Sequence, residues 1–260
     1  MSAKTVYLVF GSPATPHKTE EVAHWYEPHL IEMCTLPGLI SAQLYKPADV
    51  QLPRLTTKLP QTMALYEFDT DDLAGAFKTL WASSLTGRIA PPADGLFELD
   101  PKYQSAVYEL DCEYPENWGN ESPGDGLPAL PPPRKHIMLV FGSPTSPERK
   151  ADVDAWWKPH VKEMTSSPGL VACSFYRPSD VQLPRLVGSL PENMAICEFD
   201  TSDLNRDVTE LYKRGMEGYR TGVFDPDKSI APPPEGSFLL DNTYQTGIFE
   251  LVSQWPKPVA

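Results

Sequence analysis

The stretch VFGSP, residues Val9–Pro13, occurs a second time at Val140–Pro144, and VQLPRL at Val50–Leu55 returns at Val181–Leu186. In both cases the two copies are 131 residues apart. The same separation relates further pairs of identical residues: Trp25 and Trp156, Pro28 and Pro159, His29 and His160, Glu32 and Glu163, Met33 and Met164. A repeat this regular indicates that the chain contains two copies of one folding unit.

The two copies are separated by a segment with the composition of a linker. The stretch from Tyr114 to Pro133 is dense in proline and glycine and has no apolar periodicity, which is typical of an extended connection. We therefore expect a first repeat at 1–113, a linker at 114–133 and a second repeat at 134–260.

Composition limits the kinds of partner. The 260 residues carry a formal net charge of −13, whereas nucleic acid and anionic membranes bind clustered Lys and Arg. A small-molecule partner is therefore expected, with no nucleic acid and no membrane. The sequence has no apolar run of about 18 residues and no signal-peptide pattern, so we expect a cytoplasmic protein. The four cysteines occupy no repeated positions, which favours reduced, structural thiols.

Each repeat is predicted to follow the order β-α-β-β-α-β. One helix has apolar residues three and four positions apart and ends at Pro37-Gly38, and Asp71-Asp72 is expected to cap the other. The second repeat has about ten additional residues in or after its second helix. Apolar patterns place strands and then helices of the first repeat at 5–10, 39–45, 63–68 and 104–110, and at 19–36 and 71–81. The fold class is α+β, with two ferredoxin-like repeats.

The segment WYEPHLIEMCTLPGL, Trp25–Leu39, followed by a strand that ends at Tyr45, resembles the first helix and second strand of the dimeric α+β barrel superfamily, especially its EthD-like members. The resemblance implies an intramolecular dimeric α+β barrel, a monomer with an internal pseudo-dimer, whose further self-association stays open. Members of this superfamily include polyketide cyclases, decarboxylases, quinone-forming monooxygenases and haem-binding enzymes, so the resemblance indicates a fold more firmly than a reaction.

Histidines on the first helix of each repeat are the main catalytic candidates. Trp25 and His29, and likewise Trp156 and His160, are four residues apart and therefore share one helical face. Imidazole can accept and donate a proton near neutral pH; the alternative is a half-buried histidine that only supports the helix. His24 is a third candidate because the first repeat alone would bring two imidazoles to its pocket. Pro28 and Pro159 are expected to kink these helices.

Other residues are candidates for substrate binding. The retained VQLPRL loop contains Arg54 and Arg185, which could bind a carboxylate or phenolate, or could pair with Asp49 and Asp180 to fix the loop. Strand residues are candidates if their side chains line a cavity, where a tyrosine or glutamate could hydrogen-bond a polar ligand. These residues are Tyr45, Tyr176, Glu67, Glu198, Tyr103 and Tyr244.

These patterns lead to a functional hypothesis. We expect a cofactor-independent lyase or cyclase that acts on a small aromatic or polyketide-like molecule, with Trp25 and Trp156 in contact with the substrate. The chain contains no HxH or HExxH motif and no glycine-rich nucleotide loop, so no metal and no cofactor are expected. A haem-dependent or cofactor-free monooxygenase and a non-catalytic binding protein are the alternatives.

Overall fold

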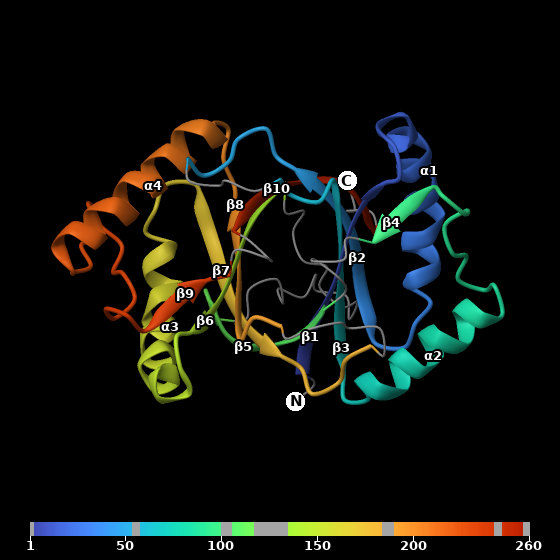
Figure 1. Cartoon of the computed structure of the whole chain (residues 1–260), viewed down its shortest axis with the longest axis horizontal. Helices are drawn as coiled ribbons and strands as arrows, with labels where there is room; N and C mark the ends of the chain where they lie inside the picture. Colours follow the sequence, from blue (N-terminus) through green and yellow to red (C-terminus); the bar gives the residue numbers. More distant parts are fainter. Residues whose placement is uncertain are drawn as a thin grey trace, which may run out of the picture.

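The fold is that of a computed structural model, which describes residues 3–53, 58–99, 106–116, 135–183, 190–241 and 246–256. Figure 1 shows strands in the centre of the molecule, with helices on two opposite sides. In the first half the elements are β1 Ala3–Pro13, α1 Thr19–Met33, β2 Leu39–Pro47, β3 Thr62–Thr70, α2 Leu73–Leu85, β4 Phe97–Leu99 and β5 Ala106–Tyr114. In the second half they are β6 His136–Pro144, α3 Lys150–Met164, β7 Leu170–Pro178, β8 Asn193–Phe199, α4 Leu204–Thr221, β9 Phe238–Leu240 and β10 Gly247–Trp255.

The same order of elements thus occurs in both halves. A three-residue 3-10 turn precedes α1 and another precedes α3, at Pro16–Lys18 and Pro147–Arg149. The short strands β4 and β9, absent from the sequence prediction, pair with the ends of β1 and β6. Tyr114, expected to begin the linker, is the last residue of β5. Residues 117–134 of the expected linker lie outside the described ranges.

The helix α1 follows the apolar spacing of its sequence. Its buried residues, Val22, Tyr26, Leu30 and Met33, recur at intervals of three and four and therefore form one stripe that packs on the strands. The helix continues through Pro28, as α3 continues through Pro159, so neither proline ends its helix.

The second helix of each half begins at the predicted kind of cap. The Asp72 side chain accepts a hydrogen bond from the Gly75 backbone N–H at 2.8 Å, which satisfies one of the amides left unpaired at a helix start. In the second half Asp203 accepts from the Arg206 N–H at 3.0 Å. The helix α4 has 18 residues where α2 has 13, so part of the predicted insertion lengthens this helix.

The strands of both halves form one closed barrel rather than two separate sheets. Within the halves the neighbours are β2-β3-β1-β5 and β7-β8-β6-β10. Between the halves, β5 pairs with β7 and β10 pairs with β2, all antiparallel. These two seams pair every edge of the ring, which removes the open edges that each four-stranded sheet would otherwise expose. The intramolecular α+β barrel is therefore present.

The interior of the barrel is a packed apolar core. Alternate residues of β1, such as Leu8 and Phe10, face inward and join inward residues of the other half. The rings of Phe10 and Phe141, one from each half, lie 6.3 Å apart in an edge-to-face arrangement. The opposite faces of the strands pack against α1 and α2 in the first half, and against α3 and α4 in the second. The molecule thus has three cores, and the central one joins the halves.

The glycine in VFGSP permits a close contact that recurs in both halves. A Cβ atom on Gly11 would lie 2.1 Å from the ring of Phe97, and one on Gly142 would lie 2.2 Å from the ring of Phe238. Real Cβ contacts are never that short, so any side chain at these positions would displace a phenylalanine of β4 or β9. The retention of this motif follows from the packing of these short strands.

The VQLPRL motif holds the two halves together through its glutamine. The Gln51 side chain accepts from the Ile248 N–H at 2.9 Å and donates to the Ile248 carbonyl at 2.7 Å. Gln182 makes the reciprocal contacts with Val107, at 3.1 and 2.7 Å. Each amide therefore behaves like one more residue of a strand in the opposite half. Arg54 and Arg185 lie outside the described ranges, so the predicted pairs with Asp49 and Asp180 stay predictions.

Replacement of either glutamine by leucine should destabilise the whole chain. Gln51→Leu or Gln182→Leu leaves one backbone N–H and one C=O of the opposite half without these partners, and we expect a loss of about 1–3 kcal/mol in the free energy of unfolding. Urea denaturation at pH 7 measures the loss. Lys58→Ala, at an exposed position after the first loop, should be nearly neutral. Equal stability of the glutamine variants and this control would contradict the proposed role of the amides.

Candidate functional site

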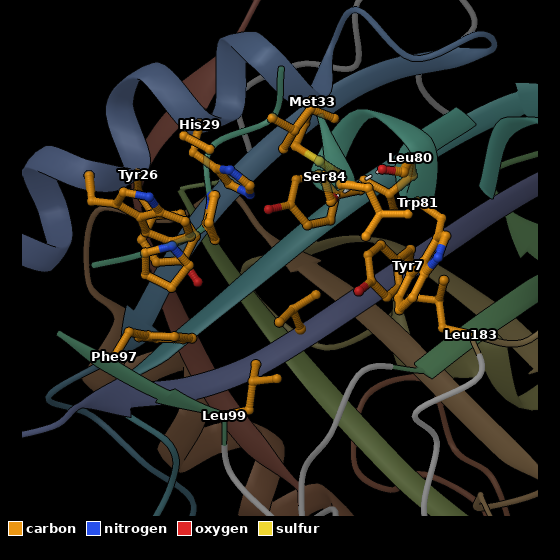
Figure 2. A pocket seen from close by; sticks show the side chains of 18 residues that line it. Tyr7, Tyr26, His29, Met33, Leu80, Trp81, Ser84, Phe97, Leu99 and Leu183 are labelled. Atoms are coloured by element: carbon orange, nitrogen blue, oxygen red, sulfur yellow. Dashed lines mark hydrogen bonds between the residues drawn. The ribbon is translucent and has the colours of Figure 1, made fainter. Parts of the chain in front are cut away.

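A large cavity lies between the helices and strands of the first half. Its volume is about 670 Å³, within the range of ligand pockets. Figure 2 shows His29 and Met33 extending from α1, Leu80 and Trp81 from α2, and Tyr7 from β1 around a common space. Six aromatic side chains line it: Tyr7, Trp25, Tyr26, Tyr66, Trp81 and Phe97. This first cavity is therefore an aromatic site with a few polar groups.

His29 is held in the wall of the first cavity as a neutral imidazole. Burial disfavours the charged ring and lowers its pKa from 6.5 to about 4, and a hydrogen bond with the Ala90 backbone only partly opposes this effect. The ring stacks on Trp25, with centroids 4.4 Å apart and an angle of 23° between the planes. Nδ1 is buried and has no hydrogen-bond partner, which leaves Nε2 as the ring nitrogen on the cavity side.

A second polar atom without a partner lies beside His29. The Nε1 atom of Trp25 is buried and has no hydrogen-bond partner, although an indole N–H normally donates when it is buried. An unpaired buried polar atom costs about 1–3 kcal/mol. The wall of the first cavity therefore contains two unsatisfied polar atoms on stacked rings.

Three tyrosines supply further donors to the wall. Tyr7 and Tyr66 stack with centroids 5.5 Å apart, and Tyr26 belongs to α1. Burial raises the pKa of Tyr26 and of Tyr66 above the usual value of 10. Both phenols stay protonated at neutral pH and can donate hydrogen bonds, but they cannot act as bases there.

The corresponding space in the second half is a smaller and less polar cavity. This second cavity has a volume of about 320 Å³ and contains His160 and Trp156 at the positions equivalent to His29 and Trp25. The three tyrosines of the first cavity are all replaced by side chains without a hydroxyl. The equivalent residues are Met138 for Tyr7, Trp157 for Tyr26 and Cys197 for Tyr66.

Each cavity is completed by a residue from the opposite half. Leu183, in the second VQLPRL motif, lines the first cavity, and Leu52, in the first motif, lines the second. Sequence reasoning missed this exchange because it treated the motif as a loop of its own repeat. The replacement of the three tyrosines was also missed, although it can be read from an alignment of the two copies.

The structure brings some predicted site residues together and places others elsewhere. Trp25 and His29 line the first cavity, and Trp156 and His160 line the second. His24 is exposed on α1, where its Nδ1 lies 2.8 Å from the Glu20 carbonyl oxygen. Because it does not line the cavity, the expectation of two imidazoles at the first pocket is corrected.

The predicted strand residues face the barrel interior instead of a cavity. Tyr45 and Tyr176 belong to the central core, and Glu67 and Glu198 are buried on the same face of their strands. Glu67 accepts a hydrogen bond from Ser41 in this interior. None of the four lines either cavity, because side-chain direction alternates along a strand and the barrel interior is already filled. Tyr103 and Tyr244, like Arg54 and Arg185, lie outside the described ranges.

Metal ligands and membrane-spanning helices are missing from the described residues. In these ranges no group of three or more His, Cys, Asp or Glu side chains is placed to hold a metal ion. Over the same ranges, no helix has both the length and the apolar character needed to cross a bilayer.

Comparison with known proteins identifies the class of fold. No family model matches the sequence, and no curated protein sequence matches it. Similar solved structures include an anthrone oxidase-like protein, with a TM-score of 0.55 and 13% identity over 98% of this chain and 93% of that one. A chlorite dismutase-like protein has a TM-score of 0.53 and 10% identity, covering 97% and 96%. A haem-binding protein from Thermus thermophilus has a TM-score of 0.50 and 12% identity, covering 97% and 92%.

These likenesses cover nearly the whole of each chain and concern the fold alone. The chain has the dimeric α+β barrel fold of chlorite dismutase-like proteins. Because one fold hosts many reactions, the function depends on the residues of the two cavities.

The lowered pKa of His29 predicts a pH-dependent stability. The folded state holds the ring neutral down to about pH 4, whereas the unfolded chain protonates it near pH 6.5. The contribution is therefore present above pH 6.5 and is lost as the pH falls toward 4, by up to about 3 kcal/mol. Denaturation curves should show a smaller loss between pH 7 and 4.5 in His29→Gln than in wild type. An unchanged pH dependence in the variant would contradict the buried, neutral assignment.

Proposed function

We propose that the first cavity binds a small aromatic or polyketide-like molecule and that His29 removes a proton from it. The observation that carries this proposal is the neutral imidazole of His29, stacked on Trp25 in the aromatic wall of a cavity of about 670 Å³. The aromatic walls suit a planar, unsaturated ligand.

The mechanism follows from the protonation states of the wall. His29 is neutral at pH 7, so its unprotonated ring nitrogen can accept a proton from an activated C–H or O–H bond. The negative charge that develops on a substrate oxygen would be stabilised by hydrogen bonds from the protonated phenols of Tyr26 and Tyr66. Apolar side chains such as Leu80 and Leu183 exclude water from this region.

Proton removal is the first step of two related reactions. An enolate formed in this way can close a ring, lose water or lose carbon dioxide, as a lyase or cyclase requires. The same carbanion can react directly with molecular oxygen, as a cofactor-free monooxygenase requires. The likeness of fold to an anthrone oxidase-like protein is the reason to test this second reaction. Both reactions use the same proton acceptor in the first cavity. We place the lyase or cyclase reaction first and the oxygenase second.

A haem-dependent reaction fits the described walls poorly. Haem carries two propionates, and no lysine or arginine is among the described residues that line either cavity. In the first cavity His29 is also stacked flat on Trp25 and bonded to the Ala90 backbone, which disfavours its use as an axial ligand. The residues present therefore do not fit haem.

The organisation of the chain supports a further part of the proposal. We regard the two halves as products of a tandem duplication of an EthD-like unit, with repeats at 1–113 and 134–260 and a linker at 114–133. The strand seams between the halves then replace the contacts of a homodimer, so that the chain acts as a monomer with an internal pseudo-dimer. A cytoplasmic location, expected from the sequence pattern, completes the proposal.

Proton removal can be tested with anthrone as a probe carbon acid. In deuterated buffer the wild-type chain should catalyse exchange of the C10 methylene hydrogens, observed by proton NMR. His29→Gln should lower the catalysed rate by roughly 10²- to 10⁴-fold because the acceptor is lost. Oxygen consumption in the same samples, with anthraquinone and water as products, distinguishes the oxygenase from the lyase or cyclase.

His24→Gln is the matched control, since it changes an exposed imidazole on the same helix. We expect wild-type exchange in this variant. If His29→Gln keeps the wild-type rate, or if wild-type protein binds anthrone without exchange, the first cavity is a binding site and the non-catalytic alternative is favoured.

Titration with haemin checks the argument against haem. We expect no sharpened or shifted Soret band and no change in the fluorescence of the cavity tryptophans beyond that caused by free haemin. A saturable Soret shift that disappears in His29→Gln or in His160→Phe would show that a cavity accommodates haem after all.

A further inference from the structure

The second cavity differs from the first in how its histidine is held. His160 is buried, and its Nδ1 lies 3.5 Å from the Glu163 carboxylate oxygen Oε2. Neither of these two buried atoms has a hydrogen bond to another group. In the first half the equivalent carboxylate, Glu32, is instead hydrogen-bonded to the Ala90 N–H at 2.9 Å. The second half therefore directs a carboxylate at its imidazole, and the first does not.

The backbone carbonyl near the histidine is also used differently. In the second half the Trp156 indole donates to the Ala231 carbonyl at 3.2 Å, whereas the equivalent Trp25 has no partner. His29 has no carboxylate directed at its Nδ1, because Glu32 is bonded to the Ala90 N–H. His160 has Nδ1 turned to Glu163, which does not line the cavity, and this leaves Nε2 for the cavity side. A carboxylate at Nδ1 favours the tautomer with its proton there, so Nε2 is an acceptor.

The rest of the wall is mostly apolar and rich in sulfur, and Tyr212, Tyr219 and Thr246 also line it. Met138, Met164, Met216 and Cys197 line the cavity together with the two tryptophans of α3. At about 320 Å³ the space is near the lower limit of ligand pockets. Its occupant should be smaller than that of the first cavity, largely apolar, and able to donate one hydrogen bond.

We propose that the second cavity is a separate binding site for a single-ring apolar molecule that carries one hydroxyl donor, such as a simple phenol. The His160 imidazole accepts the hydroxyl proton in a hydrogen bond through Nε2, and Glu163 is a positioning residue that fixes the tautomer. The aromatic ring of the ligand packs against Trp156 and the methionines. This site is independent of the reaction proposed for the first cavity, because different residues line it.

The methionines make the site directly observable. In the full chain labelled with ¹³C at the methionine methyl groups, Met138, Met164 and Met216 report on the second cavity and Met33 reports on the first. Titration with 4-ethylphenol should shift the first three signals saturably. Shifts confined to Met33, or no shift up to the solubility limit of the probe, would overturn the proposal.

The hydrogen bond is tested with a second probe and a variant. Ethylbenzene has the same ring without the donor, so the ratio of its Kd to that of 4-ethylphenol measures recognition of the hydroxyl. This ratio should fall roughly 3- to 10-fold from wild type to His160→Phe. Comparing ratios cancels the different solubilities of the probes and any general change of packing in the variant. An unchanged ratio contradicts the role of His160.

Two further variants separate occupancy of the cavity from positioning of the ring. A Cβ on Gly215 would meet no atom within 4 Å, so Gly215→Phe can fill the cavity without backbone strain and should abolish the shifts of Met138 and Met164. In wild type, ¹⁵N spectra should show the Nδ1–H tautomer of His160, and Glu163→Ala should lose this preference. Persisting shifts in Gly215→Phe, or an unchanged tautomer in Glu163→Ala, would overturn the corresponding part of the proposal.

Discussion

The pairing of strands between the two halves is the constraint on which the rest of the structure depends. A four-stranded sheet with helices on one face has an apolar opposite face and two edges with unpaired backbone groups, and neither is tolerated well in water. The seams β5–β7 and β10–β2 resolve both problems at once. They pair the edges, and they enclose the apolar faces in a common core where Phe10 of one half meets Phe141 of the other.

Closure of the barrel also determines where a ligand can bind. Because the interior is filled by side chains such as Leu8 and Ile137, the remaining space lies outside the barrel, between strands and helices. There, Gln51 and Gln182 bring each VQLPRL motif onto a strand of the opposite half, and Leu52 and Leu183 complete the cavity walls of that half. The integrity of the cavities therefore depends on the association of the halves.

Two similar halves support two different chemical environments. The shared tryptophan and histidine make a close ring contact in both halves, since each pair is four residues apart on a helix. Differences at a few neighbouring positions then decide polarity and hydrogen bonding. The replacement of Tyr7, Tyr26 and Tyr66 removes these three hydroxyls from the second cavity, and the orientation of Glu163 toward His160 replaces the backbone contact of Glu32. A division of roles between the halves can thus arise from a few side chains and from the longer helix α4, which lines the second cavity.

Much of the fold could be predicted because it is encoded locally. The stripe of Val22, Tyr26, Leu30 and Met33 specifies a helix with one buried face, and Asp72 specifies where the next helix, α2, begins. The repetition of both patterns indicates two similar units. The placement of Trp25 and His29 on one face follows from helical periodicity in the same way. The assignments of site residues that were wrong or missed depend on contacts with residues far away in the chain. Alternation along β2 and β3 tells that Tyr45 and Glu67 share a face, but not whether that face meets the barrel core or a cavity.

The sequence by itself therefore determined the helices and strands, their order and the repetition of their pattern. It also determined which aromatic and imidazole groups lie on the first helix of each half. Only the tertiary structure decided which strand face became the interior, that His24 is exposed, that each cavity is completed by a leucine from the opposite half, and that a carboxylate faces His160 but not His29. The physical reason is that periodicity records which residues share a surface, whereas the partner of that surface is set by long-range packing and hydrogen bonding between segments far apart in the chain.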